Sequence, residues 1–273
     1  MLEDLLVLSL YRNRLNGPVP STLANLRLLE QLLLQNNELS DGIPTDFTRL
    51  RELCLVNLSD NKLSGVLPRD LSLLTKLVEL RLDNNQFIGV VPKNYSALKN
   101  LEVFTVHNNR VAGSLSEDLG HMQRLTRFRV SLNKVAGKIP IQLSLLTNLV
   151  ELSLNNNKLT GEIPKEISAL VNLEELRLND NQLECISHYL FPHFNYLIYL
   201  NLAVKNRGAV PPELGNLTRL EGLYLHNNLL AGPLPYELST LVNLRELYLT
   251  GNAISSSMKD IEFLLPNCKS IYI

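Results

Sequence analysis

An asparagine recurs at intervals of about 24 residues along most of this 273-residue chain, and this period restricts the possible folds more than any other feature of the sequence. Each asparagine closes a Leu-x-Leu-x-x-Asn segment or a close variant of it. Lys205 takes the ninth position, and the step from there to the next asparagine, Asn228, is shorter by a single residue. The series predicts about eleven repeats. Its asparagines are Asn13, Asn37, Asn61, Asn85, Asn109, Asn133, Asn157, Asn181, Asn228 and Asn252.

Apolar residues keep the same phase as the asparagines. Most asparagines have a leucine eight residues before them and an apolar residue ten residues after, such as Leu77 and Tyr95 around Asn85. One coil cannot bury these side chains alone, but stacked coils can merge them into a continuous core. The Leu-x-Leu part alternates with a period of two, which predicts a short strand in each coil, paired in parallel with the strands of neighbouring coils.

The asparagines stand where the chain leaves each predicted strand, and this position indicates a structural role. A buried Asn has an acceptor oxygen and two donor hydrogens, so we expect it to satisfy turn groups of its own coil and of the next one. Lysine has no acceptor, so Lys205 is expected to interrupt this asparagine ladder. A helical bundle is the alternative for so leucine-rich a chain. It is excluded because a Gly and a Pro recur in most repeats, as in Gly65–Pro68, and a long helix would not tolerate them.

The segment Leu149–Pro164, LVELSLNNNKLTGEIP, resembles the plant-type leucine-rich repeat with the template LxxLxLxxNxLxGxIP. The resemblance extends over the whole chain, and the Gly-x-x-Pro element marks the plant subtype. It implies an α/β repeat solenoid, a right-handed superhelix with a parallel β-sheet on its concave face and short extra strands beside that sheet. In this family the repeats form secreted enzyme inhibitors and the ectodomains of receptor-like kinases and receptor-like proteins, which bind peptides, small hormones or other proteins.

Two features depart from the family's pattern. Repeats 8 and 9, about residues 182–211, have Cys185 for the glycine, His188 for the proline and Lys205 for the asparagine, so we expect a local distortion there. The family's cysteine-paired caps are absent at both ends. We predict one leucine-rich-repeat domain over residues 1–273, uncapped at both ends. Bare apolar ends favour a fragment of a longer protein, a truncated gene product, or a chain that associates end to end with a second copy.

A column of tyrosines is the first candidate binding surface. Tyr224, Tyr248 and Tyr272 occupy the same outward position in consecutive predicted strands, with Tyr199 alongside and His226 on the same face. Tyrosine is common at binding hot spots because it is large, fairly rigid and amphipathic. The alternative is ordinary cross-strand stacking that stabilises the sheet, and both roles are compatible.

A mixed-charge patch is the second candidate surface. It contains the outward-facing basic residues Arg81, Arg127, Arg129 and Arg177, interleaved with Glu79, Asp83, Glu151 and Glu175. One interpretation is recognition of a carboxylate or an acidic segment. The other, which we favour, is a self-neutralised face whose ion pairs contribute little.

The composition argues against several other functions. The net charge is −1, with 26 basic and 27 acidic residues, so no general field attracts nucleic acid or an anionic membrane. No apolar run approaches the roughly 18 residues of a membrane span. Neither a nucleophile–base pair nor a phosphate-binding glycine loop is recognisable, so an enzyme is not predicted. The spacing of Cys185, His188 and His193 fits no familiar zinc ligand set, and no metal or other cofactor is predicted.

We therefore predict a module that binds a protein or peptide ligand and forms the ectodomain, or a fragment, of a receptor-like protein. An intracellular interaction scaffold and a secreted enzyme inhibitor are the alternatives. The residues alone leave the compartment open, since the first residues do not read as a secretory signal. The family resemblance suggests the cell surface or an extracellular location.

Overall fold

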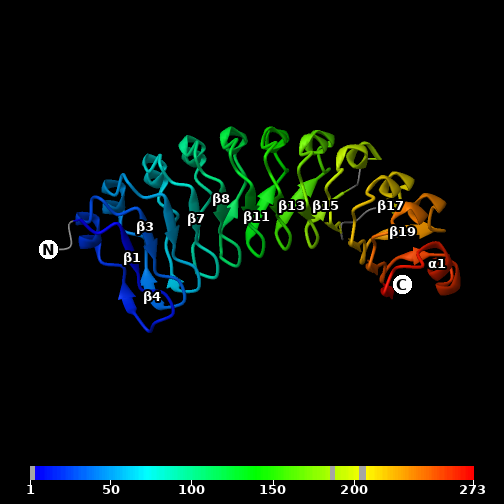
Figure 1. Cartoon of the computed structure of the whole chain (residues 1–273), viewed down its shortest axis with the longest axis horizontal. Helices are drawn as coiled ribbons and strands as arrows, with labels where there is room; N and C mark the ends of the chain where they lie inside the picture. The colour runs from blue at the N-terminus through cyan, green and yellow to red at the C-terminus, as the bar shows by residue number, and fades with distance from the viewer. Residues whose placement is uncertain (1–3, 185–187, 203–206) are drawn as a thin grey trace. The chain divides into compact units, whose positions relative to one another are not determined.

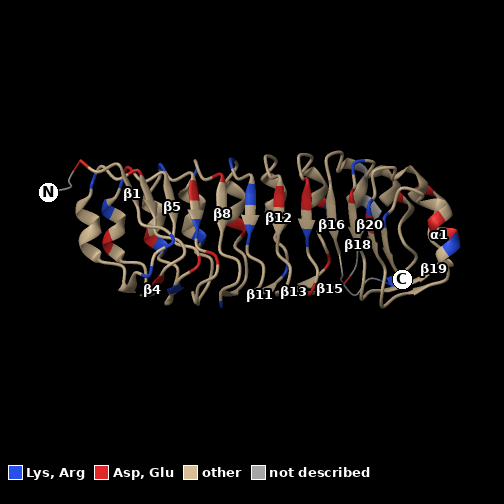
Figure 2. Ribbon diagram, turned by 60° about the horizontal axis from the view of Figure 1, so that its bottom comes forward, with Lys and Arg blue, Asp and Glu red and all other residues tan. Residues whose placement is uncertain are grey.

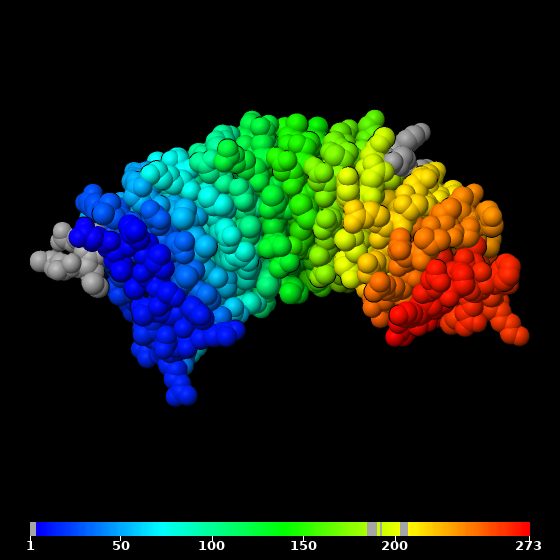
Figure 3. Space-filling view, in the orientation of Figure 1, coloured from blue at the N-terminus to red at the C-terminus, as the bar shows by residue number. Residues whose placement is uncertain are grey.

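The computed structural model describes residues 4–184, 188–202 and 207–273. The chain forms two compact units, Met1–Ala136 and Gly137–Ile273. In both units each repeat forms one coil, with a short strand on one side and a short helix on the opposite side (Figure 1). The space-filling view shows neighbouring coils of each unit packed directly on one another (Figure 3). Both units are built from the same repeat. A single domain over residues 1–273 stays a prediction.

Three-residue strands form a parallel sheet in the first unit. The middle residue of most strands is buried inside the coil, as at Leu32 and Leu80, and the residues on either side of it face outward. Leu32 lies opposite Val56, its equivalent in the next repeat, so one repeat separates neighbouring strands. In sheet order the strands are β1 (Val7–Ser9), β3 (Gln31–Leu33), β5 (Leu55–Asn57), β7 (Glu79–Arg81), β8 (Val103–Thr105) and β10 (Arg127–Arg129).

The second unit has a parallel sheet of the same kind. Its register also advances by one repeat from strand to strand, and the step from Leu200 to its partner Leu223 is shorter than the others by a single residue. The shortened repeat is thus absorbed without loss of strand pairing. In sheet order the strands are β12 (Glu151–Ser153), β14 (Glu175–Arg177), β16 (Tyr199–Asn201), β18 (Gly222–Tyr224), β20 (Glu246–Tyr248) and β22 (Ser270–Tyr272).

Short extra strands follow the turns, as the resemblance implied. In the first unit they are β2 (Asn16–Pro18), β4 (Glu38–Asp41), β6 (Lys62–Leu63), β9 (Ala112–Gly113) and β11 (Lys134–Gly137), of which only the last residue belongs to the second unit. In the second unit they are β13 (Lys158–Gly161), β15 (Gln182–Leu183), β17 (Arg207–Gly208), β19 (Leu229–Gly232) and β21 (Ala253–Ile254). Between β6 and β9 a single parallel bridge joins Val66 to Ile88.

The opposite side of the coils consists of 3-10 helices. A proline precedes most of them and holds φ near its fixed value, as at Pro68 and Pro92. The return path is short, and a 3-10 helix needs only i to i+3 hydrogen bonds, so it suits segments of about one turn better than an α-helix does. The 3-10 helices are η1 (Ser21–Asn25), η2 (Thr45–Arg49), η3 (Arg69–Leu73), η4 (Lys93–Ala97), η5 (Glu117–His121), η6 (Ile141–Leu145), η7 (Lys165–Ala169), η8 (His188–His193), η9 (Pro212–Asn216) and η10 (Tyr236–Thr240).

The helical part of the expected α/β class is therefore small. Within the described residues, α1 (Met258–Leu264) is the only α-helix. It begins with a capping box, in which the Ser257 hydroxyl accepts from the Asp260 backbone and the Asp260 carboxylate accepts from the Ser257 backbone.

The core of each unit is a stack of leucines into which aromatic rings are inserted, and three rings of the first unit pack on one another. Tyr95, Phe104 and Phe128 are almost completely buried. The Tyr95 ring meets Phe104 edge-on with centroids 5.8 Å apart, and Phe104 stacks on Phe128 at 5.9 Å. The Tyr95 hydroxyl donates to the Pro68 carbonyl at 3.2 Å, so its polar end is satisfied although burial raises its pKa well above the usual range.

The ladder asparagines tie each coil to its neighbour through hydrogen bonds. Asn85 Nδ2 donates to the Leu82 and Asp83 carbonyls of its own coil at 3.2 and 3.0 Å, and to the Leu58 carbonyl of the preceding coil at 3.0 Å. Its Oδ1 accepts from the backbone N–H of Leu63 at 2.9 Å. One buried side chain therefore satisfies four turn groups that the strands leave unpaired.

Most ladder asparagines reach back to the coil before them, so the expectation of bonds to the next coil was wrong in direction. The same bonds to the own and the preceding coil are made by Asn37, Asn61, Asn109, Asn133, Asn181 and Asn252. Asn13 and Asn157 hydrogen-bond carbonyls of their own coil, and Asn228 bonds its own coil and the Leu202 carbonyl of the preceding one.

A left-handed residue comes directly before most ladder asparagines. Asn and Asp adopt this conformation more readily than other non-glycine residues, and they fill most of these positions. Their side chains form a second, outer chain of bonds, in which Asn84 donates to Asp60 at 2.7 Å and Asn108 donates to Asn84 at 2.9 Å. Leu132 occupies the same position with φ at 53° and offers no such bond.

Two of the residues behind the predicted distortion of repeats 8 and 9, Cys185 and Lys205, lie outside the described residues. In the described part, η8 has six residues where the other 3-10 helices have five. Asn228 reaches the preceding coil over 26 residues, whereas the other ladder asparagines do so over 27.

We expect Asn85→Leu to lower the free energy of unfolding by about 1–3 kcal/mol, because a leucine leaves buried turn groups of two coils without partners. Chemical denaturation of both proteins measures this. Asn94→Leu, at an exposed position of η4, is the control and should change stability little. Equal stability of Asn85→Leu and the wild type would contradict the structural role of the ladder.

The Leu132→Asn variant should be more stable than the wild type by about 0.5–1 kcal/mol, because asparagine relieves a left-handed conformation that leucine adopts at a cost. Leu132 is exposed, so the substitution removes little buried apolar surface. A rise in thermal midpoint checks this expectation. An unchanged or lower midpoint would show that Leu132 carries no such strain.

Candidate ligand-binding surface

The outward side chains of the strands form one continuous face in each unit, called here the sheet face. Each three-residue strand contributes its first and third residue to this face. Parallel register places equivalent positions of neighbouring strands side by side, roughly 4.8 Å apart. A residue type that recurs in the same position therefore forms a column across the coils.

The tyrosine column of the second unit has this arrangement. Tyr224, Tyr248 and Tyr272 are aligned by the register of β18, β20 and β22. The first two rings stack with centroids 4.9 Å apart and planes 24° from parallel, and the next two at 4.3 Å and 21°. These geometries are those of offset-stacked aromatic pairs, so the column stabilises the sheet as the structural interpretation proposed.

Tyr199 reaches the column through a space that a glycine leaves open. Gly222 stands on the sheet face between Tyr199 and the column, where most other strands carry a side chain. A Cβ on Gly222 would lie 2.8 Å from Tyr199 Cδ1 and 2.8 Å from Tyr224 Cε2, so any larger residue would push the two rings apart. Gly222 was not among the residues predicted for this surface, although a glycine within a strand is itself a signal of close approach.

The phenol groups are linked to acidic and phenolic neighbours. The Tyr224 hydroxyl donates to Glu246 Oε2, and burial together with this carboxylate raises the pKa of Tyr224 well above its usual range. The pKa of Tyr248 is raised mainly by a hydrogen bond with Tyr272 and to a smaller extent by desolvation. Both phenols are therefore protonated at neutral pH. They can offer hydroxyl groups to a ligand as well as ring edges.

His226 extends this surface. Its ring meets Tyr248 edge-on, with centroids 6.5 Å apart. Its Nδ1 atom is buried and has no hydrogen-bond partner among the described residues.

The arginines of the mixed-charge patch are divided between the two units. Arg81 on β7 and Arg127 and Arg129 on β10 belong to the first unit, whereas Arg177 on β14 belongs to the second. Figure 2 shows basic and acidic residues interspersed along the ribbon. Arg81 Nε donates to Glu79 Oε2 at 2.9 Å, and Arg177 Nε pairs with Glu175 in the same way. Both pairs join neighbours on one strand and are partly exposed, so each contributes little to stability.

A polar cluster lies beside Arg81 in the first unit. The hydroxyl of Thr105, which is almost fully buried, donates to Asp83 Oδ2 at 2.6 Å. The other carboxylate oxygen accepts from the His107 backbone at 2.8 Å, and the His107 ring nitrogen Nδ1 lies 3.5 Å from it. The sequence indicated Asp83 as a patch member but not that Thr105 and His107 hold its carboxylate in place.

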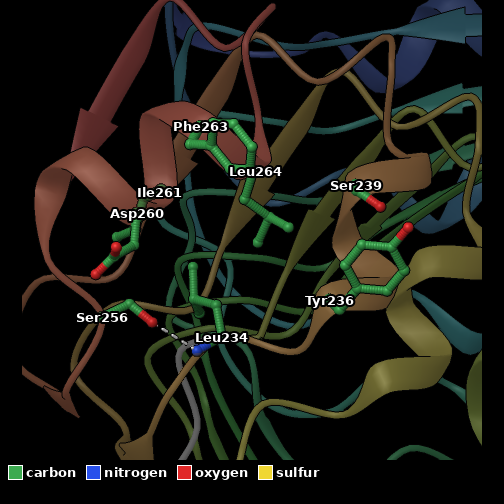
Figure 4. A pocket seen from close by; sticks show the side chains of 8 residues that line it. All are labelled: Leu234, Tyr236, Ser239, Ser256, Asp260, Ile261, Phe263 and Leu264. Carbon is green, nitrogen blue, oxygen red and sulfur yellow. Dashed lines mark hydrogen bonds between the residues drawn. The ribbon is translucent and has the colours of Figure 1, made fainter.

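Two hollows lie away from the sheet faces. The valine groove of the first unit, of about 720 Å³, is formed by Ile43, Val66, Pro68, Val90 and Pro92, with Arg69 and Lys93 beside them. The aromatic pocket of the second unit, of about 320 Å³, lies between η10 and α1. Figure 4 shows Tyr236 and Phe263 on two sides of it, with Leu234 and Leu264 between them.

Among the described residues, the histidines and cysteines that could bind a metal ion are scattered along the chain. No three His, Cys, Asp or Glu residues of the described ranges lie close enough together to hold a metal ion. Cys185 and the side chain of His188 fall outside the described part, and His193 is exposed. Cys54 and Cys268 are free thiols whose pKa values are raised by burial. The helices that the structure describes lack the length and apolar character that a membrane span requires.

The sequence matches the family described as Leucine Rich Repeat over residues 4–26, 28–50 and 52–74. The description Leucine Rich repeats (2 copies) matches residues 147–190. No curated protein matches the chain.

Several solved structures are similar to this chain. The plant peptide hormone receptor RGFR1, solved in complex with RGF2, is 35% identical with a TM-score of 0.89, over 92% of this chain and 40% of the receptor chain. The ectodomain of the Arabidopsis receptor kinase HAESA, solved with an N-terminally extended IDA peptide hormone, is 30% identical with a TM-score of 0.82. The match covers 99% of this chain and 54% of the HAESA chain. A plant ice-binding protein is 25% identical with a TM-score of 0.79, and the match covers 96% of this chain and 83% of the ice-binding protein.

The chain thus spans about half the length, or less, of the two receptor chains. The repeat matches, the parallel sheets with their extra strands and the likeness to plant receptor ectodomains agree with one another. The chain belongs to the plant-type leucine-rich-repeat family.

Proposed function

We propose that this chain is a binding module for a peptide or protein ligand and forms part of a receptor-like ectodomain at the cell surface. The observation that carries the proposal is the likeness to the plant peptide hormone receptor RGFR1, whose structure was solved in complex with RGF2. HAESA, also solved with a peptide hormone, supports it. An intracellular scaffold or a secreted enzyme inhibitor would offer the same sheet faces, but the two receptor ectodomains favour the first assignment.

The tyrosine column with Tyr199 and His226 is our proposed contact surface for the ligand. Stacking covers the ring faces inside the column but leaves ring edges and hydroxyl groups on the sheet face. Tyr272 is 47% exposed and Tyr199 is 38% exposed. A short stretch of peptide can therefore bury aromatic area and bond phenol groups without displacing any part of the sheet.

The four arginines Arg81, Arg127, Arg129 and Arg177 are a secondary proposal for ligand contact. A ligand carboxylate at Arg81 would compete with Glu79, which already holds the guanidinium, and the same holds for Arg177 and Glu175. Binding there gains less than binding to an unpaired arginine. End-to-end association of two copies stays a prediction, independent of the sheet faces.

Selection from a random peptide library displayed on phage, with the purified chain as bait, tests the proposed ligand class. We expect selected peptides to bind the Tyr248→Ala variant more weakly than the wild type by ~1 kcal/mol or more, because the variant removes a ring at the middle of the column. Calorimetric titration with the synthetic peptides measures this. Tyr236→Ala is the matched control, since Tyr236 is an exposed tyrosine away from the sheet face.

The column would be removed from consideration if every selected peptide, including those that do not bind elsewhere on the chain, bound the wild type and Tyr248→Ala equally well. Failure to select any peptide would argue against the binding module itself. Thermal melting of each variant separates lost contacts from lost folding, because Tyr248 also stabilises the sheet.

A further inference from the structure

We propose that the valine groove of the first unit is a second docking site, which binds an extended segment of a partner protein that presents aliphatic side chains next to a carboxylate. The site is independent of the sheet faces, because it is formed by the turns that lead into the 3-10 helices. Its main residues are Val66 and Val90, with Arg69 and Lys93 at the start of η3 and η4.

Aliphatic side chains are unusually exposed at the groove. Val66 is 61% exposed and Val90 is 52% exposed, and Ile88, which pairs with Val66 in the single bridge, is 46% exposed. Two consecutive coils thus place three branched apolar side chains together in water. An apolar patch of this kind, next to charged residues, is typical of an interaction surface.

The repeats provide an internal comparison for this exposure. Val66 and Val90 directly follow the glycine of the Gly-x-x-Pro element. The next three repeats carry Ser114, Lys138 and Glu162 in the same position, and repeats 9 and 10 carry Ala209 and Pro233. The fold therefore accepts a polar or charged residue at this position.

Packing between coils does not require valine either. A Cβ on Gly89 would lie 3.1 Å from Val66 Cγ1, so the valine side chain covers the glycine of the next coil. Lys138 covers Gly161 in the same way, with its Cγ 3.3 Å from the corresponding position. A lysine stem thus fills the same space while its ammonium group stays in water. Lys138 fulfils the same packing role as Val66. Packing between coils therefore does not explain why Val66 and Val90 are apolar.

Charge indicates the chemistry of the partner. Arg69 and Lys93 stand at equivalent positions of consecutive coils and line the groove. Asp70 also lines the groove, and its Oδ1 lies 3.6 Å from Arg69 Nε, but both side chains are more than half exposed, so the pair is weak and the groove keeps a positive net charge. Lys93 makes no ion pair within the described residues. The two cations therefore favour a carboxylate beside the apolar contacts.

The dimensions indicate a short segment. The groove extends from Ile43 to Lys93, over three consecutive coils, which corresponds to roughly 10 Å at the usual strand spacing. An extended chain covers this distance with about three residues. Its volume of about 720 Å³ is within the range of ligand sites, which is on the order of 300–1,000 Å³.

A phage-displayed random peptide library tests the proposal, with counter-selection on a V66K/V90K variant of the same chain. The variant should fold, because lysine occupies this position at Lys138. We expect the enriched peptides to combine aliphatic residues with Asp or Glu. They should bind the wild type at least about ten-fold more tightly than the double variant, with a smaller loss for Lys93→Glu.

Two controls separate this site from the others. Glu162→Lys introduces the same residue at the equivalent position of the second unit and should leave the affinity unchanged. Tyr248→Ala should also leave it unchanged, so failure here and failure of the proposed column are distinguishable. The proposal would be overturned if no enriched peptide bound the wild type more tightly than the double variant, or if the enriched peptides were basic. It would also be overturned if Glu162→Lys lowered the affinity as much as the double variant does.

Discussion

The hydrogen bonds of the asparagine ladder are the interaction on which the rest of the structure depends. The single coil that one repeat forms cannot make a core alone, and its short strand leaves the following turn with unpaired backbone groups. A ladder asparagine such as Asn85 satisfies these groups in two coils at once, because its two amide hydrogens are shared among three carbonyls and its oxygen accepts one further bond. The distance between coils and the register of their strands are therefore set at the same place in every repeat.

Fixed register makes side-chain columns possible, and columns give each sheet face its chemistry. Because Tyr224, Tyr248 and Tyr272 occupy one position in consecutive coils, their rings stack at the spacing that the strands impose. Gly222 allows Tyr199 to join them, which a side chain would prevent. The same repetition makes departures from the pattern informative. Val66 and Val90 are exposed and apolar, whereas the next three repeats carry Ser114, Lys138 and Glu162 at their position.

The sequence predicted the coils, the strands and the ladder positions, because each depends only on spacing along the chain. It also predicted the tyrosine column, since equal phase in a repeat means equal position in the sheet. It did not predict that Asn85 reaches the preceding coil or that the return segments are 3-10 helices, because both depend on the path of the backbone between strands. Gly222 and the valine groove were missed for the same reason: their role comes from what neighbouring coils place beside them.

The arginines were grouped as one patch although they belong to two units, since alternation shows which face a residue occupies but not which coils pack into one unit.

Amide hydrogen exchange tests the ladder most directly. The backbone N–H groups of Leu63 and Phe87 bond to the side-chain oxygens of Asn85 and Asn109. If these bonds hold the coils together, both amides should exchange as slowly as those of the buried strands of the first unit. Exchange as fast as that of the exposed turns would contradict the account, because the asparagine bonds would then contribute little to holding the coils together.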